Sequence, residues 1–521
     1  MADESDAQEP AIRFLADPAT HGIAAGEIRR IDTHAAIVFL ARDHAYKIKR
    51  AVKYPYLDFS TLDRRKAAID AEIEANRPFA SHLYLGRFAV ARGAGGRLAL
   101  GGEGAPVEWV LKMRRFDENA TLDRVASRDG IDDRLARALG AAVATAHTRA
   151  PRFDATKWIE ALGRFVDDEL TAMFGASDLF AVREVNALGE SLRAQLARIA
   201  PLLFARGDAG HVRRGHGDLH LRNVALIDGE PVLFDALEFD PVIAAGDVLY
   251  DLAFLLMDLL DRRLDRAANI VFNRYLLAAN DDSHIDALTA LPFFLALRAA
   301  IRARVALDKR KLVAGNERSR AEAEARDYTA LAAKLIAPPP PRLIAIGGLS
   351  GSGKSTVAAA LAPAIWPAPG ALHLRSDIER KRLAGIGEFE RLPQSAYTEE
   401  ASARVYARLN GLARRALAAG HSVVLDAVHA RAGEREAIEE VAGELGVAFD
   451  GIWLEIGLDE RLNRVGGRAP GASDADAKVA RSQQEYEIGD MTWHRIDAAG
   501  APGDVVERVR RAIAACSPGE A

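Results

Sequence analysis

Two short segments of this chain carry residue types that handle phosphate groups. Residues 216–223 (HGDLHLRN) place acidic and amide side chains on one loop, and residues 348–355 (GLSGSGKS) combine glycines with a lysine and a hydroxyl. Transfer of a phosphoryl group to a hydroxyl needs a carboxylate that orients the nucleophile and accepts its proton, and oxygen ligands that hold Mg²⁺. The first segment offers those groups, whereas the second offers a cradle of backbone N–H groups. The chain therefore carries two separate candidate phosphate sites.

The first site gains a third polar residue from the segment that follows it. Asp218 and Asn223 lie on the same short loop, and Asp235 ends a predicted hairpin over residues 224–234 that begins beside that loop. The three side chains can therefore converge without a long excursion of the chain. A chance HGDxHxxN followed closely by an acidic strand end is improbable, so we interpret this constellation as catalytic.

This part of the chain resembles the aminoglycoside phosphotransferase and choline kinase family, which shares its two-lobe fold with protein kinases. The family pattern is matched by residues 216–223, Asp235, Gly246-Asp247 and residues 250–253 (YDLA), and the resemblance covers roughly residues 13–336. It implies that Asp218 is the base and that Asn223 and Asp235 are metal ligands. For His216 and Asp251, bracing of the loop by hydrogen bonds is as good an explanation as contact with substrate.

A lysine that contacts the nucleotide phosphates is expected upstream, in the smaller lobe. A strand over residues 35–40 is predicted to pair with a strand over residues 44–49 across a polar turn. Lys47 and Lys49 project from one face of the second strand, and one of them should pair with a carboxylate on the next helix, Glu72 or Glu74. Alternation along the strand does not choose between the lysines. We favour Lys47 with Glu72, and the alternative is that either lysine is simply solvated.

The second site has the strand, loop and helix order of a phosphate-binding loop. An apolar run at residues 343–346 precedes the glycines, and a helix-forming run follows them. Lys354 is expected to bridge the β and γ oxygens, and Ser355 to offer its hydroxyl to Mg²⁺. The predicted nucleotide-binding residues of this loop are Gly348, Ser350, Gly351, Ser352, Gly353, Lys354, Ser355 and Thr356.

Further polar residues follow the next predicted strands. Strands at residues 371–374 and 422–425 are followed by Asp377 and Asp426, and ligands collect at the carboxyl ends of strands in doubly wound sheets. We expect Asp377 to accept a proton from an acceptor hydroxyl, with helix capping as the alternative, and Asp426 to hold Mg²⁺ or its water shell. Arg461, Arg464 and Arg468 are expected to close over phosphate as part of a lid, although spaced arginines are also common on a solvated helix face.

Residues 342–516 resemble the small P-loop kinases that act on gluconate, polynucleotide 5′ ends or toxin targets. The pair Asp377 and Arg380 is similar to the Asp-x-x-Arg of polynucleotide kinases, but this motif is short enough to arise by chance. The whole architecture resembles a family of bacterial proteins in which an aminoglycoside phosphotransferase-like half precedes a P-loop kinase-like half.

The elements that position these sites fall into two groups. A chain of 521 residues is too long for one hydrophobic core, because cores stop growing at roughly 250–300 residues. Four prolines at residues 338–341 form a stiff spacer that no helix crosses. We predict an α+β, protein-kinase-like two-lobe fold over residues 13–336, a proline linker over 337–341 and an α/β P-loop NTPase fold with a parallel sheet over 342–516.

The composition of the chain bears on its partners and on its cellular compartment. The net charge of −5 gives no global attraction to nucleic acid or to an anionic membrane, and the single cysteine, Cys516, suits a reducing cytoplasm. The apolar stretches at residues 249–260 and 291–307 contain charged residues, so we expect buried helices and no membrane partner.

These expectations combine into a bifunctional ATP-dependent phosphotransferase that uses ATP and Mg²⁺. The first half would act on a small-molecule hydroxyl acceptor, and the second on a small molecule or a polynucleotide 5′ end. The alternative is an ATP-binding regulatory protein in which one kinase-like half senses nucleotide and controls the other. Neither the acceptors nor the oligomeric state follow from the sequence.

Overall fold

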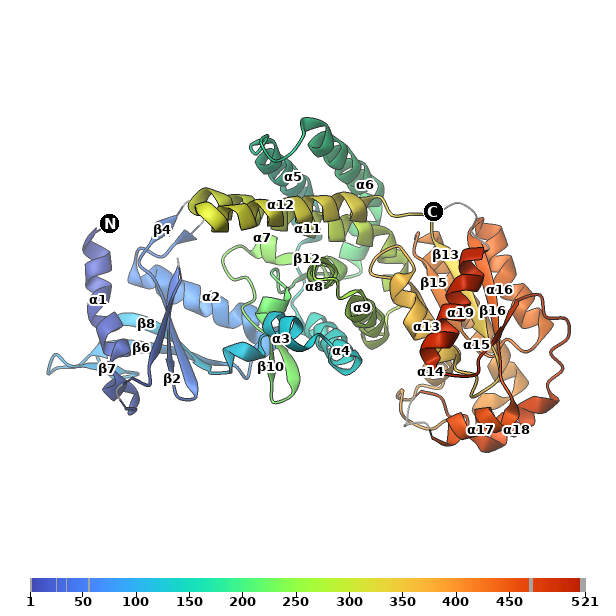
Figure 1. Ribbon diagram of the computed structural model, residues 1–521. Coiled ribbons are helices and arrows are strands. Elements are labelled where there is room, and N and C mark those ends of the chain that lie inside the picture. Colours follow the sequence, from blue (N-terminus) through green and yellow to red (C-terminus); the bar gives the residue numbers. More distant parts are fainter. Residues whose placement is uncertain (1, 25, 34, 55–56, 468–471, 516–521) are drawn as a thin grey trace. The chain divides into compact units, whose positions relative to one another are not determined.

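The computed structural model describes residues 2–515, apart from residues 25, 34, 55–56 and 468–471. By its internal contacts the chain divides into two compact units (Figure 1). Unit 1 comprises Met1–Asp167 and Ala200–Asp258, and unit 2 comprises Asp168–Ile199 and Leu259–Ala521.

Unit 1 is built on a six-stranded antiparallel sheet of order β1-β2-β3-β8-β6-β7. Its strands are β1 (Arg29–Asp32), β2 (Ala36–Ala41), β3 (His44–Lys49), β6 (Tyr84–Arg92), β7 (Leu98–Leu100) and β8 (Ala105–Arg114). β2 and β3 form the expected hairpin, in which Ala41 pairs with His44 and Ala36 pairs with Lys49. A separate two-stranded pair joins β4 (Lys53–Tyr54) to β5 (Leu57–Asp58).

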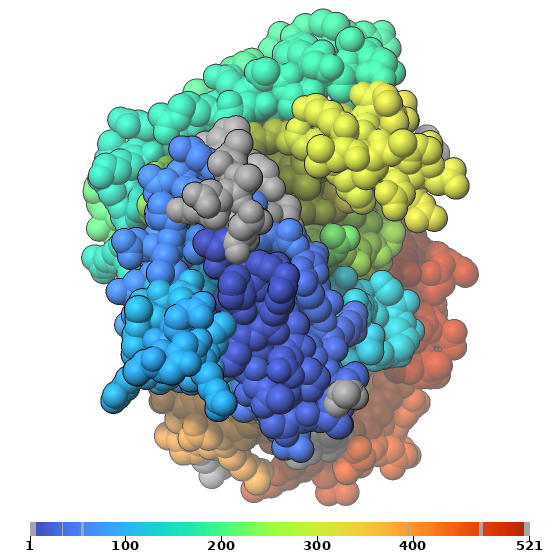
Figure 2. Space-filling view, turned by 90° about the vertical axis from the view of Figure 1, so that its left-hand side faces the viewer, coloured from blue at the N-terminus to red at the C-terminus, as the bar shows by residue number. Residues whose placement is uncertain are grey.

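A helix covers each face of this sheet. On one face, α1 (Ala2–Ala16) packs Leu15 into a cluster with Phe39 and Ile48, and Figure 2 looks onto this end of unit 1 with the N-terminal residues in dark blue. On the other face, α2 (Leu62–Ala80) packs Ile69 against Leu111. Because side chains alternate along a strand, burial of Ile48 beneath α1 turns Lys47 and Lys49 toward α2.

The remainder of unit 1 is mainly helical and carries two short antiparallel strand pairs. Its helices include α3 (Leu122–Asp129), α4 (Asp133–Arg149) and α7 (Pro241–Ala244), and α5 (Ala155–Phe174), α6 (Val182–Asp208) and α8 (Val248–Asp261) contribute residues to both units. β10 (Val224–Ile227) and β11 (Glu230–Leu233) form a hairpin, and β9 (Val212–Arg214) pairs antiparallel with β12 (Ala245–Asp247), which lies farther along the chain. The β10–β11 hairpin is the predicted one, and it separates the HGDLHLRN loop from Asp235.

Unit 2 contains a five-stranded, fully parallel sheet of order β14-β15-β13-β16-β17. Its strands are β13 (Arg342–Gly347), β14 (Leu372–Arg375), β15 (Val423–Asp426), β16 (Ala448–Glu455) and β17 (His494–Asp497). Helices of this part are α13 (Lys354–Leu361), α14 (Ser376–Leu383), α15 (Glu399–Ala418), α16 (Ala432–Leu445), α17 (Leu458–Gly466), α18 (Ala477–Ser482) and α19 (Pro502–Ala515). Strand residues such as Ile344 and Ile452 pack with Val357 of α13 and Val509 of α19 in one buried cluster.

Unit 2 also includes four helices that precede the prolines: α9 (Asp265–Ala279), α10 (Ser283–Asp286), α11 (Leu291–Leu312) and α12 (Gly315–Ile336). In the described part of the chain, one stretch, Ser283–Leu312, is long and apolar enough to cross a membrane by length and composition, and 78% of its most apolar window is buried in the structure. The last boundary between the two compact units therefore falls before the prolines, between Asp258 and Leu259. The domain boundaries that we placed at the prolines stay predictions.

Candidate active sites

In unit 1, Glu72 of α2 is shared by the two candidate lysines of β3. Lys47 Nζ lies 2.8 Å from Glu72 Oε1, and Lys49 Nζ lies 2.7 Å from Glu72 Oε2. Lys49 also reaches Glu238 Oε1 at 2.6 Å, whereas Lys47 Nζ lies 3.4 Å from Asp235 Oδ1. Lys47 is therefore the lysine that faces the predicted metal ligand, in the pair with Glu72 that we favoured.

Glu74, the other carboxylate that we considered, forms an exposed pair with Arg77 at 3.1 Å. Its side chain thus lies away from both strand lysines.

Lys47 and Glu72 hold each other in the ionised state. Burial by itself lowers the pKa of Lys47, but the carboxylates of Glu72, Asp235 and Glu238 raise it well above its ordinary value. Burial likewise raises the pKa of Glu72, and the two lysines outweigh this effect and bring it below its usual range. A fixed ammonium therefore stands beside Asp235, which is the arrangement that a nucleotide phosphate would need.

The predicted catalytic loop holds its two polar side chains together. Asn223 Nδ2 donates to Asp218 Oδ2 and to the Asp218 backbone oxygen, both at 2.9 Å. Asp218 Oδ2 also lies 3.4 Å from His220 Nε2. The side-chain nitrogen of Asn223 is used in the contacts with Asp218, so the side-chain oxygen of Asn223 is the atom of this amide that can act as a metal ligand.

Asp235 occupies a strained position immediately after the hairpin. Its φ of 62° lies in the left-handed region, which costs a residue other than glycine about 1–3 kcal/mol unless the surroundings enforce it. Here the Asp235 backbone N–H donates to the Tyr84 hydroxyl at 3.0 Å, and the Ala236 N–H donates to Asn76 Oδ1 at 2.9 Å. These two contacts, which the sequence did not suggest to us, hold the turn in place.

A buried carboxylate braces the HGDLHLRN loop. Asp251 accepts hydrogen bonds from the backbone N–H groups of His216 at 2.7 Å and Gly217 at 2.9 Å, and lies 3.1 Å from His147 Nε2. The His216 ring, itself fully buried, contacts the Phe234 backbone oxygen at 2.9 Å and so connects the loop to the segment that ends at Asp235. Of the two explanations that we left open for His216 and Asp251, the geometry favours bracing.

In unit 2, the glycines of the second motif have the backbone conformations that a phosphate-binding loop requires. Gly348, Gly351 and Gly353 have φ values of 140°, 88° and 95°, and α13 begins directly afterwards at Lys354. A Cβ on Gly351 would lie 2.7 Å from the Arg461 backbone oxygen. The loop therefore directs backbone N–H groups and the positive end of α13 toward one point, which is a typical anion site.

Two residues far along the chain support this loop. Ser350 N–H donates to Gln483 Oε1 at 2.6 Å, and Arg461 Nε donates to the Ser350 backbone oxygen at 2.8 Å. Arg461 is buried and braces the loop. Within the described residues, the hydroxyl of Ser352 is buried without a hydrogen-bond partner.

The two carboxylates predicted near the strand ends have different electrostatic settings. Burial, and then the charge of Asp426, raise the pKa of Asp377 against the opposing effects of Ser473 and Lys354. Burial would also raise the pKa of Asp426, but His373 and Arg375 bring it below its usual range. The two pKa values are thus shifted in opposite directions: Asp426 favours its ionised form, and Asp377 takes up a proton more easily.

Asp377 is not the capping residue of α14, because Arg375 occupies the N-cap position.

The predicted lid arginines have separate outcomes. Arg464 lies close to the loop, since a Cβ on Gly353 would be 3.6 Å from Arg464 Nη1, and it is held by Glu460 at 2.6 Å and by the Ala498 backbone oxygen at 2.9 Å. Arg468 lies outside the described residues. A phosphate-binding role for both arginines stays a prediction.

The phosphate loop opens into a cleft of 1970 Å³ within unit 2, lined by Lys354, Asp377 and Asp426, by one face of α15 and by residues 472–476. Asp474 ties that last segment to the opposite wall, because Asp474 Oδ2 accepts from the Leu392 N–H at 2.9 Å and from the Tyr397 hydroxyl at 3.0 Å. The cleft thus has the phosphate loop, its predicted nucleotide end, at one side and a wall formed by α14 and α15.

The oxygen donors at both sites suit a hard cation. Asn223 and Asp235 in unit 1, and Ser355 and Asp426 in unit 2, offer amide, hydroxyl and carboxylate oxygens, which Mg²⁺ prefers over nitrogen or sulfur ligands.

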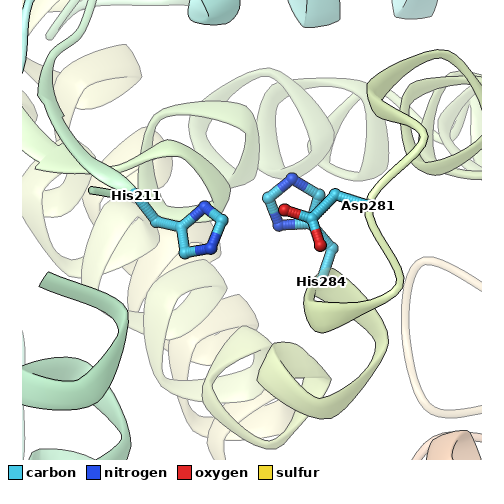
Figure 3. A group of neighbouring side chains, drawn as sticks. All are labelled: His211, Asp281 and His284. Carbon is cyan, nitrogen blue, oxygen red and sulfur yellow. The ribbon is translucent and has the colours of Figure 1, made fainter. Parts of the chain in front are cut away.

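One further polar group in unit 2 belongs to neither site. Asp281 precedes α10 and His284 lies within it, and both are labelled in Figure 3. Asp281 Oδ1 accepts from the Ser283 N–H at 2.9 Å, and the His284 ring lies 5.9 Å from the Tyr275 ring. Both side chains thus have local structural contacts.

Comparison with known proteins gives two family matches. Residues 53–288 match the model of the phosphotransferase enzyme family, and residues 343–487 match the model of an AAA domain. Proteins of Mycobacterium tuberculosis (strain H37Rv) and Mycobacterium bovis, both described as uncharacterized, are 29% identical over 477 residues, which cover 90% of this chain and 92% of theirs.

Solved structures with similarity include two kinases. A choline/ethanolamine kinase family protein from Mesorhizobium loti covers 63% of this chain and 99% of its own, with 16% identity and a TM-score of 0.36. A gluconokinase from Sinorhizobium meliloti covers 34% of this chain and 93% of its own, with 20% identity and a TM-score of 0.26.

The antiparallel sheet with its helices, followed by the parallel sheet with its phosphate loop, confirms the predicted fold class. The two family matches identify the chain as an ATP-dependent phosphotransferase that joins a kinase-like phosphotransferase segment to a P-loop kinase segment.

Proposed function

We propose that this protein is bifunctional, with one phosphotransfer site in each unit. The observation that carries the proposal is that each unit has its own phosphate-handling set and candidate base. Unit 1 has the Lys47–Glu72 pair beside Asp235 and the Asp218 loop, and unit 2 has the phosphate loop with Asp377 in the same cleft.

In unit 1, Asp218 orients the acceptor hydroxyl and takes its proton as the acceptor oxygen bonds to the γ-phosphorus of ATP and the bond to the β-phosphate bridging oxygen breaks. Lys47, kept charged by its carboxylate neighbours, holds nucleotide phosphate. Asn223 and Asp235 would hold Mg²⁺, which neutralises phosphate charge when it is bound.

In unit 2, the backbone N–H groups of the phosphate loop and the Lys354 ammonium hold the triphosphate. Ser355 and Asp426 would hold Mg²⁺. Asp377 accepts the acceptor proton, a role supported by its place in the cleft and its raised pKa. Arg464 and Arg468 close over the nucleotide phosphates as part of a lid.

The proposed acceptors are hydroxyl compounds. For unit 1 we propose a small molecule, and for unit 2 a small molecule in preference to a polynucleotide 5′ end. The preference rests on two arginines of the cleft lining, Arg391 and Arg431, which form ion pairs with Asp476 and Glu399 and so offer less free charge to a polynucleotide backbone. A cytoplasmic setting accords with the single cysteine and with the use of ATP.

The test uses the full chain with Asp218→Asn, with Lys354→Ala and with both changes. Each protein is incubated with γ-labelled ATP and a panel of metabolites and 5′-hydroxyl oligonucleotides, and Glu74→Gln serves as a surface control. We expect each single variant to lose one set of labelled products and keep the other. Retention of all products by both single variants would refute bifunctional transfer, and ATP binding without turnover at one site would support a sensing role there.

A further inference from the structure

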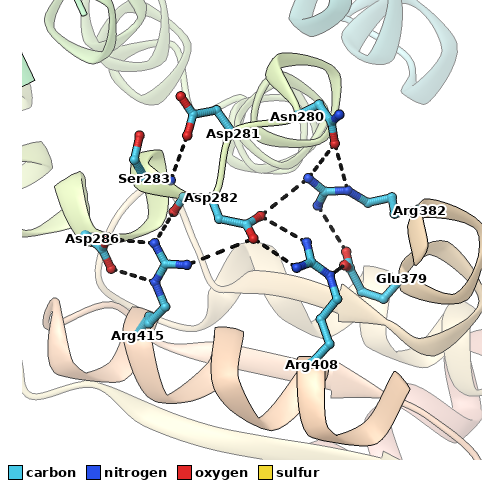
Figure 4. Close-up of polar contacts among 9 residues, drawn as sticks. All are labelled: Asn280, Asp281, Asp282, Ser283, Asp286, Glu379, Arg382, Arg408 and Arg415. Atoms are coloured by element: carbon cyan, nitrogen blue, oxygen red, sulfur yellow. Dashed lines mark hydrogen bonds and ion pairs between the residues drawn. The ribbon is translucent and has the colours of Figure 1, made fainter. Parts of the chain in front are cut away.

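Three arginines of α14 and α15, the helices that form the wall of the unit 2 cleft, converge on the turn between α9 and α10 (Figure 4). Arg408 of α15 donates to both carboxylate oxygens of Asp282, at 3.0 and 3.1 Å. Arg415, two turns later, donates to both oxygens of Asp286 at 2.8 and 2.7 Å and to the Asp282 backbone oxygen at 2.9 Å. Two side chains of one helix thus engage the same short turn through paired hydrogen bonds.

The third arginine ties α14 to the same turn. Arg382 Nη2 donates to Asn280 Oδ1 at 2.7 Å and lies 3.4 Å from Asp282 Oδ1. Glu379, also on α14, accepts from both Arg382 and Arg408 and is only 4% exposed. The resulting network, which we call the acid clamp, consists of the carboxylates Asp282, Asp286 and Glu379 and the guanidinium groups Arg382, Arg408 and Arg415.

The acid clamp is balanced in charge and partly shielded from water. The side chains of Arg382 and Arg408 are 20% and 24% exposed, and that of Asp282 is 27% exposed. Bidentate arginine–carboxylate pairs in such surroundings are geometrically demanding, so they restrict how the elements can move relative to each other.

The opposite faces of the clamped helices line the cleft. Tyr406 and Asn410 of α15 and Asp377 of α14 border the cleft, whereas Arg408 and Glu379 belong to the acid clamp. A helix turns by about 100° per residue, so the step of two residues from Tyr406 to Arg408 turns the side chain by about 200°, to the other side of the helix. Each helix therefore presents one face to the reaction and the other to the α9–α10 turn.

The strand that leads into α14 is held by the same part of the chain. β14 is an edge strand, and side chains of α9 bind the backbone around its start: the His373 N–H donates to Asn273 Oδ1 at 2.8 Å, and Asn269 Nδ2 donates to the oxygen of Ala371, which precedes the strand, at 3.0 Å. The β14–α14 segment, which carries Asp377, is thus fixed by α9 before it and by the acid clamp after it.

We propose that the α9–α10 turn positions the acceptor wall of the P-loop site, with Asp282 as its central positioning residue. This inference rests on the proposed phosphotransfer function of unit 2. A segment that lies before the prolines, and within the phosphotransferase family match, thereby supports the second active site. The nucleotide end, on β13 and α13, has no residue in the acid clamp.

The test compares Asp282→Asn and Arg408→Gln with Arg414→Gln, in the full chain. Arg414 is the matched control because it lies on α15 next to Arg415 but forms an exposed pair with Glu444. Hydrogen–deuterium exchange of the α14 and α15 amides should accelerate by at least about fivefold in both clamp variants and remain unchanged in the control. Asp282→Glu should restore part of the protection.

A kinetic measurement separates positioning from general loosening. ATP hydrolysis with water as acceptor is measured in an Asp218→Asn background, which silences the proposed base of unit 1. In Asp282→Asn we expect kcat to fall about fivefold while the KM for ATP changes less than about twofold, because only the acceptor wall is released. A parallel rise in KM would instead indicate a general structural defect and would overturn the positioning role.

The two measurements also distinguish this inference from the proposed function. If the P-loop site of the unmodified chain turns over no ATP, its proposed function fails, while the exchange experiment still decides whether the wall is clamped. If Asp282→Asn does not fold, Arg408→Gln, which leaves Arg415 and Asp286 paired, replaces it. Unaltered exchange in α14 and α15 of a folded clamp variant would refute the inference.

Discussion

Substitution of Glu72 by glutamine tests the charge arrangement of the unit 1 site. The side chain of Glu72 is 1% exposed, and its two oxygens lie 2.8 and 2.7 Å from the ammonium groups of Lys47 and Lys49. Glutamine keeps the shape but removes the negative charge, so it leaves two buried ammonium groups with one shared counter-charge missing. The variant should therefore lose both stability and the orientation of Lys47.

The size of the loss in stability depends on the carboxylates that remain beside the two lysines. Breaking a buried ion pair by removing one partner costs about 3–5 kcal/mol. Lys49 keeps Glu238 at 2.6 Å and Lys47 keeps Asp235 at 3.4 Å, so the lower end of that range, about 3 kcal/mol, is expected. For a unit of 150–250 residues, a change of about 1 kcal/mol shifts Tm by roughly 2–4 °C, so unit 1 should melt roughly 6–12 °C lower.

The assay combines thermal unfolding with nucleotide binding, in a Lys354→Ala background that removes binding by the P-loop. Glu74→Gln is the matched control, because Glu74 lies on the same helix in an exposed pair worth less than about 1 kcal/mol. We expect Glu72→Gln to weaken binding of ATP at unit 1 by at least about tenfold and the control to leave it unchanged. Equal melting temperatures and equal affinities for the two variants would refute the reasoning.

Three further changes test other parts of the molecule. Asp251→Asn should lower ATP turnover by unit 1 about tenfold or more without weakening ATP binding, because the carboxylate holds the His216 N–H at 2.7 Å; unchanged turnover in steady-state kinetics would contradict bracing. Gly351→Ala should weaken nucleotide binding at the P-loop by more than about tenfold in calorimetry, because its φ is 88° and the new Cβ would meet the Arg461 oxygen at 2.7 Å; retained affinity would show that the loop adapts. Burial lowers the pKa of His421 to about 4, so the folded state favours the neutral ring. The stabilisation of unit 2 by this preference is complete above the unfolded pKa of about 6.5 and is lost as the pH falls toward about 4. Denaturant unfolding at pH 7 and 4.5 should therefore show about 2 kcal/mol less pH dependence in His421→Gln, and identical pH dependence in both proteins would contradict this assignment.

Local pattern predicted the elements that carry the chemistry. The hairpin of β2 and β3, the β10–β11 hairpin and the strand, loop and helix order around Lys354 all depend on residues close together in sequence, where alternation, turn residues and glycine spacing act directly. For the same reason, the sequence could place Lys47 and Lys49 on one strand face.

The partners of those side chains depended on packing between distant segments. Lys47 and Asp235 are 188 positions apart, and Ser350 and Gln483 are 133 apart, so no local pattern relates them. Arg461, which we grouped with the lid arginines, is buried beneath the phosphate loop, because burial depends on what covers a helix face and not on the spacing of its arginines.

The sequence by itself determined that this chain has two phosphate-handling motifs, each in its own strand-and-helix context, because the chemistry requires fixed residue types at short spacings. Only the tertiary structure decided that helices before the four prolines pack into the unit that carries the P-loop, and that Asp282 engages Arg408 across 126 positions. Prolines restrict the backbone of a linker, whereas the division of a chain into compact units follows from contacts that the folded chain makes over long sequence distances.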